Sequence, residues 1–312
     1  MIISASRRTD IPAFYSEWFI NRIKSGFLLT RNPFNANQVK RISLLPNDVD
    51  AIVFWTRNPK KLLPHLEYLD QLGFRYYFQY TITGYSKKLE TNTLHPLKAI
   101  DIFKELSLKI GKEKIIWRYD PIILSNVTPI PEHLRLFEKI ASLLSGYTNQ
   151  VVISFADLYK KTETNLDKVD GLEYSDILHN EKELNNLCTG LKEIAVKYKM
   201  HITTCAEEVN LKSTGIEHGK CIDDRLIESI FDIKVTNSKD QGQRSECGCV
   251  KSVDIGMYNS CLHGCIYCYA TYQKKGALDN YKKHDPQSSF LIGSDEGYEH
   301  FINSIPIQNS LL

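Results

Sequence analysis

The sequence predicts an α/β fold: a parallel β-sheet flanked by helices, arranged as a partial or complete (β/α) barrel of the TIM type. Three observations support this prediction. Short apolar runs alternate with longer segments of helical period. The alternation recurs in six units, with roughly 25 to 50 residues between successive runs. No Gly-x-Gly-x-x-Gly turn follows any run, which favours a barrel over a dinucleotide-binding sheet.

The apolar runs have the length and the β-branched or aromatic content of buried strands. They cover residues 1–6, 50–55, 75–83, 114–119, 151–155 and 201–205. In the segments that follow them, apolar residues recur every three or four positions, as they do on one face of a helix. These predicted helices cover residues 13–24, 60–72, 95–110, 131–144, 182–198 and 224–231. Asn58 and Pro59 supply a cap and a first helical residue for the second of them.

The alternation ends after about residue 232, where the composition changes. Residues 233–270 are rich in Gly, Ser, Asp and Cys, which is typical of irregular structure around ligands. We therefore divide the chain into a β/α barrel core at residues 1–232 and a cysteine-rich, cluster-binding extension at residues 233–312. We expect the extension to pack on the barrel mouth and not to form an independent domain, because no linker separates the two.

The composition is that of an ordinary globular protein, with 42% hydrophobic and 24% charged residues in a chain of 312. Its 39 basic and 37 acidic residues leave a formal net charge of +2, so no bulk field attracts nucleic acid or a membrane surface. No apolar stretch approaches the ~18 residues of a membrane span, and the start lacks the apolar core of a signal peptide. We expect a cytoplasmic protein with neither nucleic acid nor membrane as a partner.

All eight cysteines lie after residue 187. A disulfide scaffold is usually a short extracellular chain with its cysteines spread along it, so this clustering favours metal or iron–sulfur ligation. Cys188 lies within the helical pattern at residues 182–198 and is expected to be a small buried hydrophobe. The other seven cysteines fall into two groups.

The first group is the CxxxCxxC sequence of Cys261, Cys265 and Cys268, with Tyr267 directly before the last cysteine. Three closely spaced thiolates suit a [4Fe–4S] cluster, because each can bind a different corner of the cube. The fourth iron then lacks a protein ligand, and an open metal position is where chemistry takes place. The spacing therefore predicts an open-site cluster.

The second group is Cys205, Cys221, Cys247 and Cys249. Four cysteines are a full complement for a metal without an open position, so they could hold a second iron–sulfur cluster or a structural zinc ion. The long gaps between them leave another interpretation open. In it, Cys205 and Cys221 are core residues, and Cys247 and Cys249 only neighbour the first group.

Polar residues gather at the carboxyl ends of the predicted strands, where a β/α barrel has its active site. They include Arg7 and Arg8, Arg57, Arg118 and Asp120, Asp157, and the pair Glu207 and Glu208. We take Arg57, Arg118, Asp120 and Asp157 as candidate catalytic residues. The arginines could bind a carboxylate or phosphate through forked hydrogen bonds, or they could pair with the nearby aspartates as structural bridges.

The sequence NSCLHGCIYCY at residues 259–269 resembles the cluster loop of the radical S-adenosylmethionine (SAM) enzymes. Along nearly the whole chain, SRRTDIP, VFWTRNP, WRYDP, ISFAD and DIGMYNSC resemble an uncharacterised domain-of-unknown-function family. Its members carry cysteines of the radical SAM type near the carboxy terminus.

The resemblance implies a radical SAM-type barrel in which Cys261, Cys265 and Cys268 bind the [4Fe–4S] cluster and SAM binds the fourth iron. Tyr267 would lie near the adenine, and Arg7 and Arg8 are candidates for the SAM carboxylate. The implied reaction is reductive cleavage of SAM to a 5′-deoxyadenosyl radical, with electrons from a donor such as flavodoxin or ferredoxin. The substrate, a small molecule or another kind of compound, is not implied.

Two features depart from the radical SAM pattern. The cluster loop of those enzymes normally follows the first barrel strand, whereas here it follows the last predicted one. A circular permutation explains the difference if residues 252–258 contain a strand that lies beside residues 1–6. In addition, no glycine-rich run of the GGE type follows a strand.

The sequence therefore favours a radical SAM-like iron–sulfur enzyme. One alternative is an iron–sulfur protein that does not use SAM and serves redox or sensing. Another is a binding module stabilised by zinc.

Overall fold

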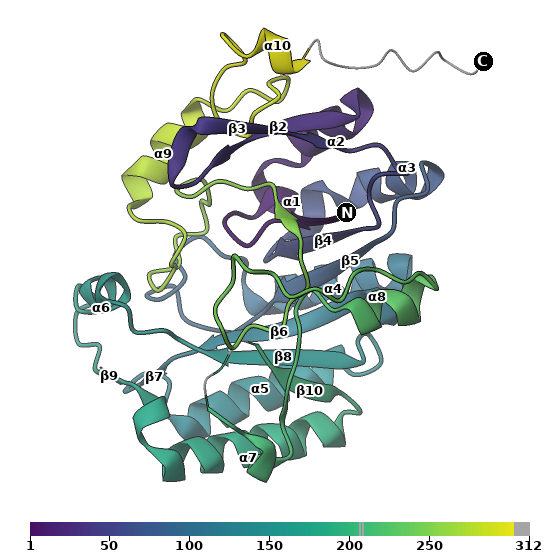
Figure 1. The fold of residues 1–312 in the computed structure, drawn as a ribbon. Coiled ribbons are helices and arrows are strands. Elements are labelled where there is room, and N and C mark those ends of the chain that lie inside the picture. The colour runs from purple at the N-terminus through teal and green to yellow at the C-terminus, as the bar shows by residue number, and fades with distance from the viewer. Residues whose placement is uncertain (206, 208, 303–312) are drawn as a thin grey trace.

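The computed structural model describes residues 1–205, 207 and 209–302. At its centre is a sheet of eight parallel strands in the order β11–β10–β8–β6–β5–β4–β1–β12 (Figure 1). The strands are β1 (Ile2–Ala5), β4 (Ala51–Thr56), β5 (Tyr76–Thr81), β6 (Ile115–Ile122), β8 (Gln150–Phe155), β10 (His201–Thr204), β11 (Glu217–His218) and β12 (Val253–Asp254). From β1 to β11, each strand lies next to the sheet strand that precedes it in the chain, as repeated βα units require.

Helices follow the strands at all six positions that the sequence predicts, and three further helices of the described chain, at residues 160–166, 274–282 and 299–302, are not predicted. The helices are α1 (Ile11–Phe14), α2 (Ser16–Ser25), α3 (Leu66–Gln71), α4 (Pro96–Ile110), α5 (Ile130–Leu144), α6 (Lys160–Leu166), α7 (Glu181–Lys197), α8 (Asp224–Phe231), α9 (Lys274–Lys282) and α10 (Glu299–Ile302). Short polar side chains fix several starts: Asn180 caps α7 and Asp223 caps α8 by accepting backbone hydrogen bonds. All six predicted βα units are thereby confirmed.

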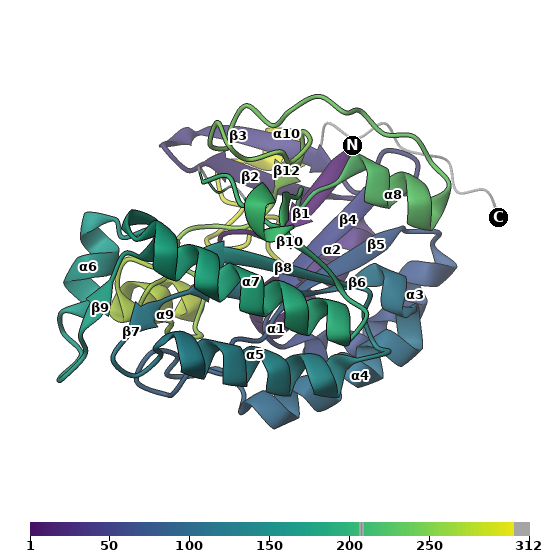
Figure 2. The ribbon, with the colours of Figure 1, turned by 90° about the horizontal axis from the view of Figure 1, so that it is seen from below.

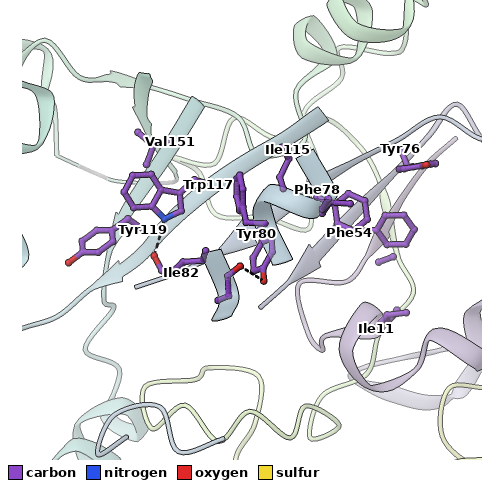
Figure 3. Packing of buried hydrophobic residues seen from close by; sticks show 14 of the residues in the cluster. Ile11, Phe54, Tyr76, Phe78, Tyr80, Ile82, Ile115, Trp117, Tyr119 and Val151 are labelled. Atoms are coloured by element: carbon purple, nitrogen blue, oxygen red, sulfur yellow. Dashed lines mark hydrogen bonds between the residues drawn. The ribbon is translucent and has the colours of Figure 1, made fainter. Parts of the chain in front are cut away.

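Two apolar clusters cover opposite faces of the sheet, because side chains alternate along each strand. On one face, Phe54 stacks on Phe78 with 4.9 Å between ring centroids, and Trp117 stacks on Phe137 of α5 at 4.7 Å. Buried polar atoms in this core are paired, since Trp117 Nε1 donates to the Ile82 carbonyl at 2.9 Å (Figure 3). Helices α4, α5 and α7 lie in a row over this face (Figure 2).

The other face of the sheet packs against the second half of the chain. Val53, Tyr77 and Ile116 point to this side and form a cluster with Ile227 of α8 and Val250 of the following loop. Cys221, Cys247 and Cys249 belong to the same cluster. The loop at residues 233–252 is therefore part of the layer that covers the sheet.

Strand β12 pairs with β1 in parallel, with Ile3 opposite Val253 and Ser4 opposite Asp254. Asp254 strengthens the junction by accepting hydrogen bonds from Ser4 Oγ at 2.9 Å and Ser6 Oγ at 2.6 Å. The predicted docking of the carboxy-terminal strand beside the first strand is thus confirmed.

Strands β11 and β12 occupy the two edges of the sheet, and no pairing joins them in the part of the chain that the structure describes. What is established is an α/β fold with a parallel sheet, and closure into a barrel stays a prediction. The boundary at residue 232 also stays a prediction, and the last ten residues of the predicted extension, 303–312, lie outside the described residues. None of the described helices is both long and apolar enough to cross a bilayer.

The structure also contains elements that the sequence does not predict. An antiparallel ribbon of β2 (Phe27–Asn32) and β3 (Asn35–Ser43) separates α2 from β4, and a small pair joins β7 (Leu124–Ser125) to β9 (Tyr174–Ser175). Both lie outside the main sheet. The ribbon lies between the first two βα units, whereas β7 and β9 each lie between a sheet strand and the helix of its unit. The ribbon escapes a search for βα units because no helix lies between its strands.

Candidate functional site

A cavity of about 450 Å³ lies at the carboxyl ends of the central strands. Its wall contains the last residues of β4 and β8 and the second half of β6. It also contains the residues that come directly after β1 and β10. Seven of the eight cysteines line it, and the exception, Cys188, is fully buried in α7 as predicted. Both predicted cysteine groups therefore face one cavity of a size typical of ligand sites.

The first cysteine group lies in a loop that begins just after β12. Cys261, Cys265 and Cys268 are each half-buried and line the cavity, and the Cys268 amide donates to the Cys265 carbonyl at 3.2 Å. Cys265 also pairs with Glu90 as an isolated antiparallel bridge, so the loop is tied to the segment that follows β5. The structure thus brings the three predicted ligands to one wall.

Asp10 holds the same loop from the other side. Its Oδ2 atom accepts from His263 Nε2 at 2.7 Å and from the Arg57 amide at 2.7 Å. Its Oδ1 atom accepts from Thr56 Oγ1 at 2.8 Å and from the Ala13 amide at 2.9 Å. One buried carboxylate therefore joins the start of α1, the end of β4 and the cysteine loop.

Arg57, a candidate catalytic residue, lies inside a second polar network. Its Nη1 donates to Glu90 Oε1 at 2.8 Å and its Nη2 donates to the Tyr267 hydroxyl at 2.7 Å. Glu90 Oε1 also accepts from Thr83 Oγ1 at 2.6 Å and from the Tyr267 hydroxyl. Burial disfavours the charge of Arg57, but Glu90, with smaller contributions from Tyr267, Cys265 and Asp120, outweighs burial and holds the pKa of the guanidinium well above its usual range.

Cys261 and Cys265 sit in surroundings that oppose the ionisation of their thiols. Burial raises the pKa of Cys265 to about 12, although Arg57 acts in the opposite direction. Burial also raises the pKa of Cys261, and the neighbouring sulfur of Cys268 adds to the effect. A cation bound between them would reverse this balance, because thiolates are the form that binds metals.

The four cysteines of the second group are also brought together. The Sγ atoms of Cys221 and Cys205 are 2.7 Å apart, and Cys205 packs against the buried cluster that contains Cys221, Cys247 and Cys249. All four line the cavity. Both interpretations that the sequence leaves open for this group stay predictions.

Arg118 and Asp120 lie between the second group and the cavity. Arg118 Nε donates to Asp120 Oδ2 at 2.9 Å, and Arg118 Nη1 donates to Cys221 Sγ at 2.8 Å and to Gln79 Oε1 at 3.3 Å. Asp120 also accepts from the Ser154 hydroxyl. Burial opposes the ionisation of Asp120, but Arg118, the Ser154 hydroxyl and Arg57 together outweigh it and keep the pKa of the carboxyl below its usual value.

The remaining predicted residues differ in how tightly they are held. Asp157 is bound by Arg244 at 2.6 Å, an ion pair that the sequence does not suggest. Arg7 lies against Trp55 and makes only long polar contacts, 3.5 Å to Ser252 Oγ among them. Its Nη2 atom has no hydrogen-bond partner within the described ranges.

Arg8 makes one long hydrogen bond, 3.5 Å from Nη1 to the Gly256 carbonyl, and lies over the ring of Tyr258. Glu207 accepts from the Phe155 amide at 2.9 Å and does not line the cavity. Glu208 lies outside the described residues.

Sequence reasoning misses Glu90, Trp55 and Arg244. Glu90 lies in a polar loop after β5 with no periodic pattern around it, so no local signal indicates that it reaches the cysteine loop. Trp55 belongs to β4 and reads as an ordinary strand residue, yet its ring lies beneath both Arg7 and Arg118, at 5.4 and 5.0 Å. Arg244 follows irregular chain that sets no direction for its side chain.

The described His, Cys, Asp and Glu side chains do not by themselves form a finished cage for a metal ion. What the cavity offers is a set of donors: three thiols on one side, four on the other, and five arginines with three aspartates on the wall. Such a set can bind metals through sulfur and an anionic ligand through the arginines.

Comparison with known proteins identifies the family of the chain but no activity. No curated protein matches the chain. Among solved structures, a candidate alpha-L-fucosidase from Bacteroides thetaiotaomicron VPI-5482 is similar, with 12% sequence identity and a TM-score of 0.31. That match covers 77% of this chain and 85% of the other. The profile of DUF1848, a domain of unknown function, matches residues 2–270, and the chain belongs to this family.

Proposed function

We propose that the protein is an iron–sulfur enzyme of the radical SAM type. Cys261, Cys265 and Cys268 would bind a [4Fe–4S] cluster, and SAM would bind in the cavity next to it. The cluster, when bound, supplies an electron that cleaves SAM and leaves a 5′-deoxyadenosyl radical to abstract hydrogen from a substrate. The chain itself supplies the binding, orientation and shielding described below.

The observation that carries the proposal is the position of the cysteine loop in the sheet. Strand β12 is parallel to β1 and lies at one edge, so the loop that leaves β12 emerges at the carboxyl end of the strands. Read from β12, the sheet runs β12–β1–β4–β5–β6–β8–β10–β11, and the cysteines follow its first strand. The cluster loop of radical SAM enzymes follows the first barrel strand, so a permuted chain would put the cysteine loop of this protein in the corresponding place.

The donors on this wall fit such a group. Three thiols from one short loop face the same cavity, which agrees with a cluster that uses three protein ligands and leaves one iron open. Asp10 and Glu90 hold the two halves of the loop through His263 and Tyr267. Positioning of this kind tunes a metal centre through residues that do not ligate it.

The arginines divide into two kinds, which gives them different roles in the proposal. Arg57 and Arg118 are held by the buried carboxylates of Glu90 and Asp120, so they contribute fixed positive charge to the wall. Arg7 and Arg8 make longer polar contacts and are the better candidates for the carboxylate of SAM. Asp120 and Asp157 remain the candidates for contact with the substrate.

The test is anaerobic reconstitution of the full chain with iron and sulfide, followed by reduction in the presence of SAM and measurement of 5′-deoxyadenosine. We expect the wild type to bind a cluster and form deoxyadenosine. Cys265→Ala should form none while keeping its fold, because the loop lies outside the main core. Cys188→Ala is the matched control, since Cys188 is buried in α7 and belongs to neither group.

Two results would overturn the proposal. If deoxyadenosine forms equally in Cys265→Ala, the first cysteine group is not the site of the reaction. If a cluster assembles in the wild type but SAM is neither bound nor cleaved, the protein is better described as an iron–sulfur protein for redox or sensing.

A further inference from the structure

The second cysteine group gathers residues from three separate segments of the chain. Cys205 follows β10, Cys221 follows β11, and Cys247 and Cys249 lie in the loop before β12. Cys221 Sγ lies 2.7 Å from Cys205 Sγ, and Cys205 packs against the buried cluster to which Cys221, Cys247 and Cys249 belong. All four side chains line the same cavity.

Two glycines allow these segments to approach so closely. A Cβ on Gly219 would lie 2.6 Å from Thr203 Oγ1, so only glycine lets the chain before Cys221 pass over β10. A Cβ on Gly248 would lie 3.1 Å from Lys220 Cγ, which is tighter than ordinary contact. Gly219 lies two positions before Cys221, and Gly248 lies between Cys247 and Cys249. The absence of a side chain at both positions lets the cysteine-bearing segments come together.

N–H donors face two of the four sulfurs. The Ile222 amide donates to Cys249 Sγ at 3.3 Å, and Arg118 Nη1 donates to Cys221 Sγ at 2.8 Å. A neutral thiol accepts weakly, whereas a thiolate accepts strongly. N–H groups directed at sulfur are the partners expected around thiolates that ligate a metal.

The position of Cys221 is fixed from the sheet. Tyr77 Oη and Gln79 Nε2, both on β5, donate to the Cys221 carbonyl at 2.7 and 2.8 Å. These bonds hold the backbone while leaving the sulfur free to turn. The ring of Trp55 contacts the guanidinium groups of both Arg7 and Arg118, which lie 5.4 and 5.0 Å from its centroid.

We propose that Cys205, Cys221, Cys247 and Cys249 bind one divalent metal ion of the zinc class as a closed tetrathiolate site. Four thiolates complete a tetrahedral shell, and a metal–sulfur distance of about 2.3 Å places neighbouring sulfurs about 3.8 Å apart. The described side chains do not yet surround such a point. Cys205 Sγ and Cys221 Sγ would separate from 2.7 Å to this spacing by rotation of their side chains.

A single ion suits this group better than a cluster. In a [4Fe–4S] cluster each cysteine binds a separate iron, so the sulfurs stand apart at the corners of the cube. Here the sulfurs of Cys205 and Cys221 are in direct contact at 2.7 Å, a separation that a small rotation brings to the edge of one tetrahedron more readily than to the wider spacing of a cluster. The ion would join β10, β11 and the loop before β12 and so stabilise the wall opposite the first cysteine group. This inference does not depend on the proposed function.

The experiment uses the full chain in which Cys261, Cys265 and Cys268 are all replaced by alanine, so that only the second group can bind. Cobalt(II) is the probe, because its visible spectrum reports tetrahedral geometry and sulfur-to-metal charge transfer. We expect one cobalt ion per chain with the tetrahedral thiolate spectrum, displaced by zinc at one equivalent. Adding Cys221→Ala or Cys247→Ala should abolish the spectrum, whereas adding Cys188→Ala should leave it unchanged.

Two outcomes would overturn the inference. The first is the absence of a tetrahedral thiolate spectrum in the triple variant, a result that does not depend on whether Cys221→Ala folds. The second is the incorporation of iron and sulfide at the second group during anaerobic reconstitution, which would mean a cluster instead of a single ion. Neither outcome bears on deoxyadenosine formation, so failure here is distinguishable from failure of the proposed function.

Discussion

Arg57 and Glu90 form an ion pair, with 2.8 Å between Nη1 and Oε1, although one follows β4 and the other follows β5. Their side chains are only 13% and 4% exposed. The Tyr267 hydroxyl contacts both of them, so the pair is also the anchor of the cysteine loop. A buried charge whose partner is removed is strongly destabilising.

We therefore expect Glu90→Gln to lower the free energy of unfolding by about 3 kcal/mol, because Arg57 would stay buried without its counter-charge. Urea denaturation measures the change. Glu132→Gln is the matched control, since its partner Arg135 is 64% exposed and exposed pairs contribute little. Equal effects of the two substitutions would show that the Arg57–Glu90 pair does not stabilise the fold.

Arg118 tests whether a candidate catalytic residue is also structural. Its guanidinium is 5% exposed and bonds Asp120, Gln79 and Cys221, so Arg118→Ala leaves Asp120 with the Ser154 hydroxyl alone. We expect a loss of about 3 kcal/mol in unfolding free energy, comparable to other broken buried pairs.

Arg225→Ala is the comparison for Arg118→Ala, because Arg225 is 69% exposed and pairs with Asp223 at the surface. If Arg118→Ala lowers ligand affinity but leaves the melting temperature at the wild-type value, the residue lines the cavity without supporting the fold.

Gly256 marks a close approach just before the cysteine loop. A Cβ at this position would clash with Ser6 Oγ and lie 2.6 Å from Ser6 Cβ, although the backbone of Gly256 needs no unusual conformation. We expect Gly256→Ala to cost about 1–3 kcal/mol through overpacking and to weaken metal binding by the cysteine loop.

Gly276→Ala provides the control for Gly256→Ala. Gly276 lies within α9, and nothing would lie within 4 Å of its added Cβ. Alanine there should be neutral or stabilise the helix by about 1 kcal/mol. The melting temperature and the iron content of the two variants are the measurements. If Gly256→Ala matches the wild type in both, the predicted clash between a Cβ at position 256 and Ser6 is wrong.

The buried side chain of His133 makes the free energy of unfolding depend on pH. It is fully buried in α5, where its ring bonds the Tyr119 hydroxyl at 2.9 Å and the Ile123 carbonyl at 3.0 Å. Burial lowers its pKa below the usual 6.5, although the Ile123 carbonyl acts in the opposite direction. Below pH 6.5 the unfolded chain binds a proton that the folded chain refuses, so unfolding becomes easier as pH falls.

Below pH 6.5, we expect His133 alone to lower the free energy of unfolding by up to about 1.4 kcal/mol for each pH unit. His133→Gln should flatten this dependence, whereas replacement of the exposed His179 by asparagine should not. Urea denaturation from pH 5 to pH 8 provides the comparison, and an identical slope in both variants would rule out His133 as the cause.

The order of the elements could be predicted because apolar periodicity is a local property. Runs such as residues 114–119 and 151–155 coincide with β6 and β8, and Arg118 and Asp157 reach one cavity because parallel strands end at the same edge. The gathering of Cys261, Cys265 and Cys268 likewise follows from their closeness in sequence.

Contacts between distant loops could not be predicted in this way. Glu90 bonds Tyr267 across 177 positions, and His263 bonds Asp10 across 253. No local pattern encodes such pairs, because they depend on how loops from different strands meet above the sheet. In the sequence, His263 stands out only as part of the cysteine motif. In the structure, its ring forms a hydrogen bond with the carboxylate of Asp10.

The pairing of β12 with β1 has a consequence for how the protein is made. During translation β1 emerges from the ribosome first, and β12, which covers the outer edge of β1, emerges about 250 positions later. Until then the nascent chain carries an unsatisfied strand edge that can recruit another chain. The cavity can therefore be completed only late in translation, and a product truncated before residue 253 should aggregate instead of accumulating in soluble form.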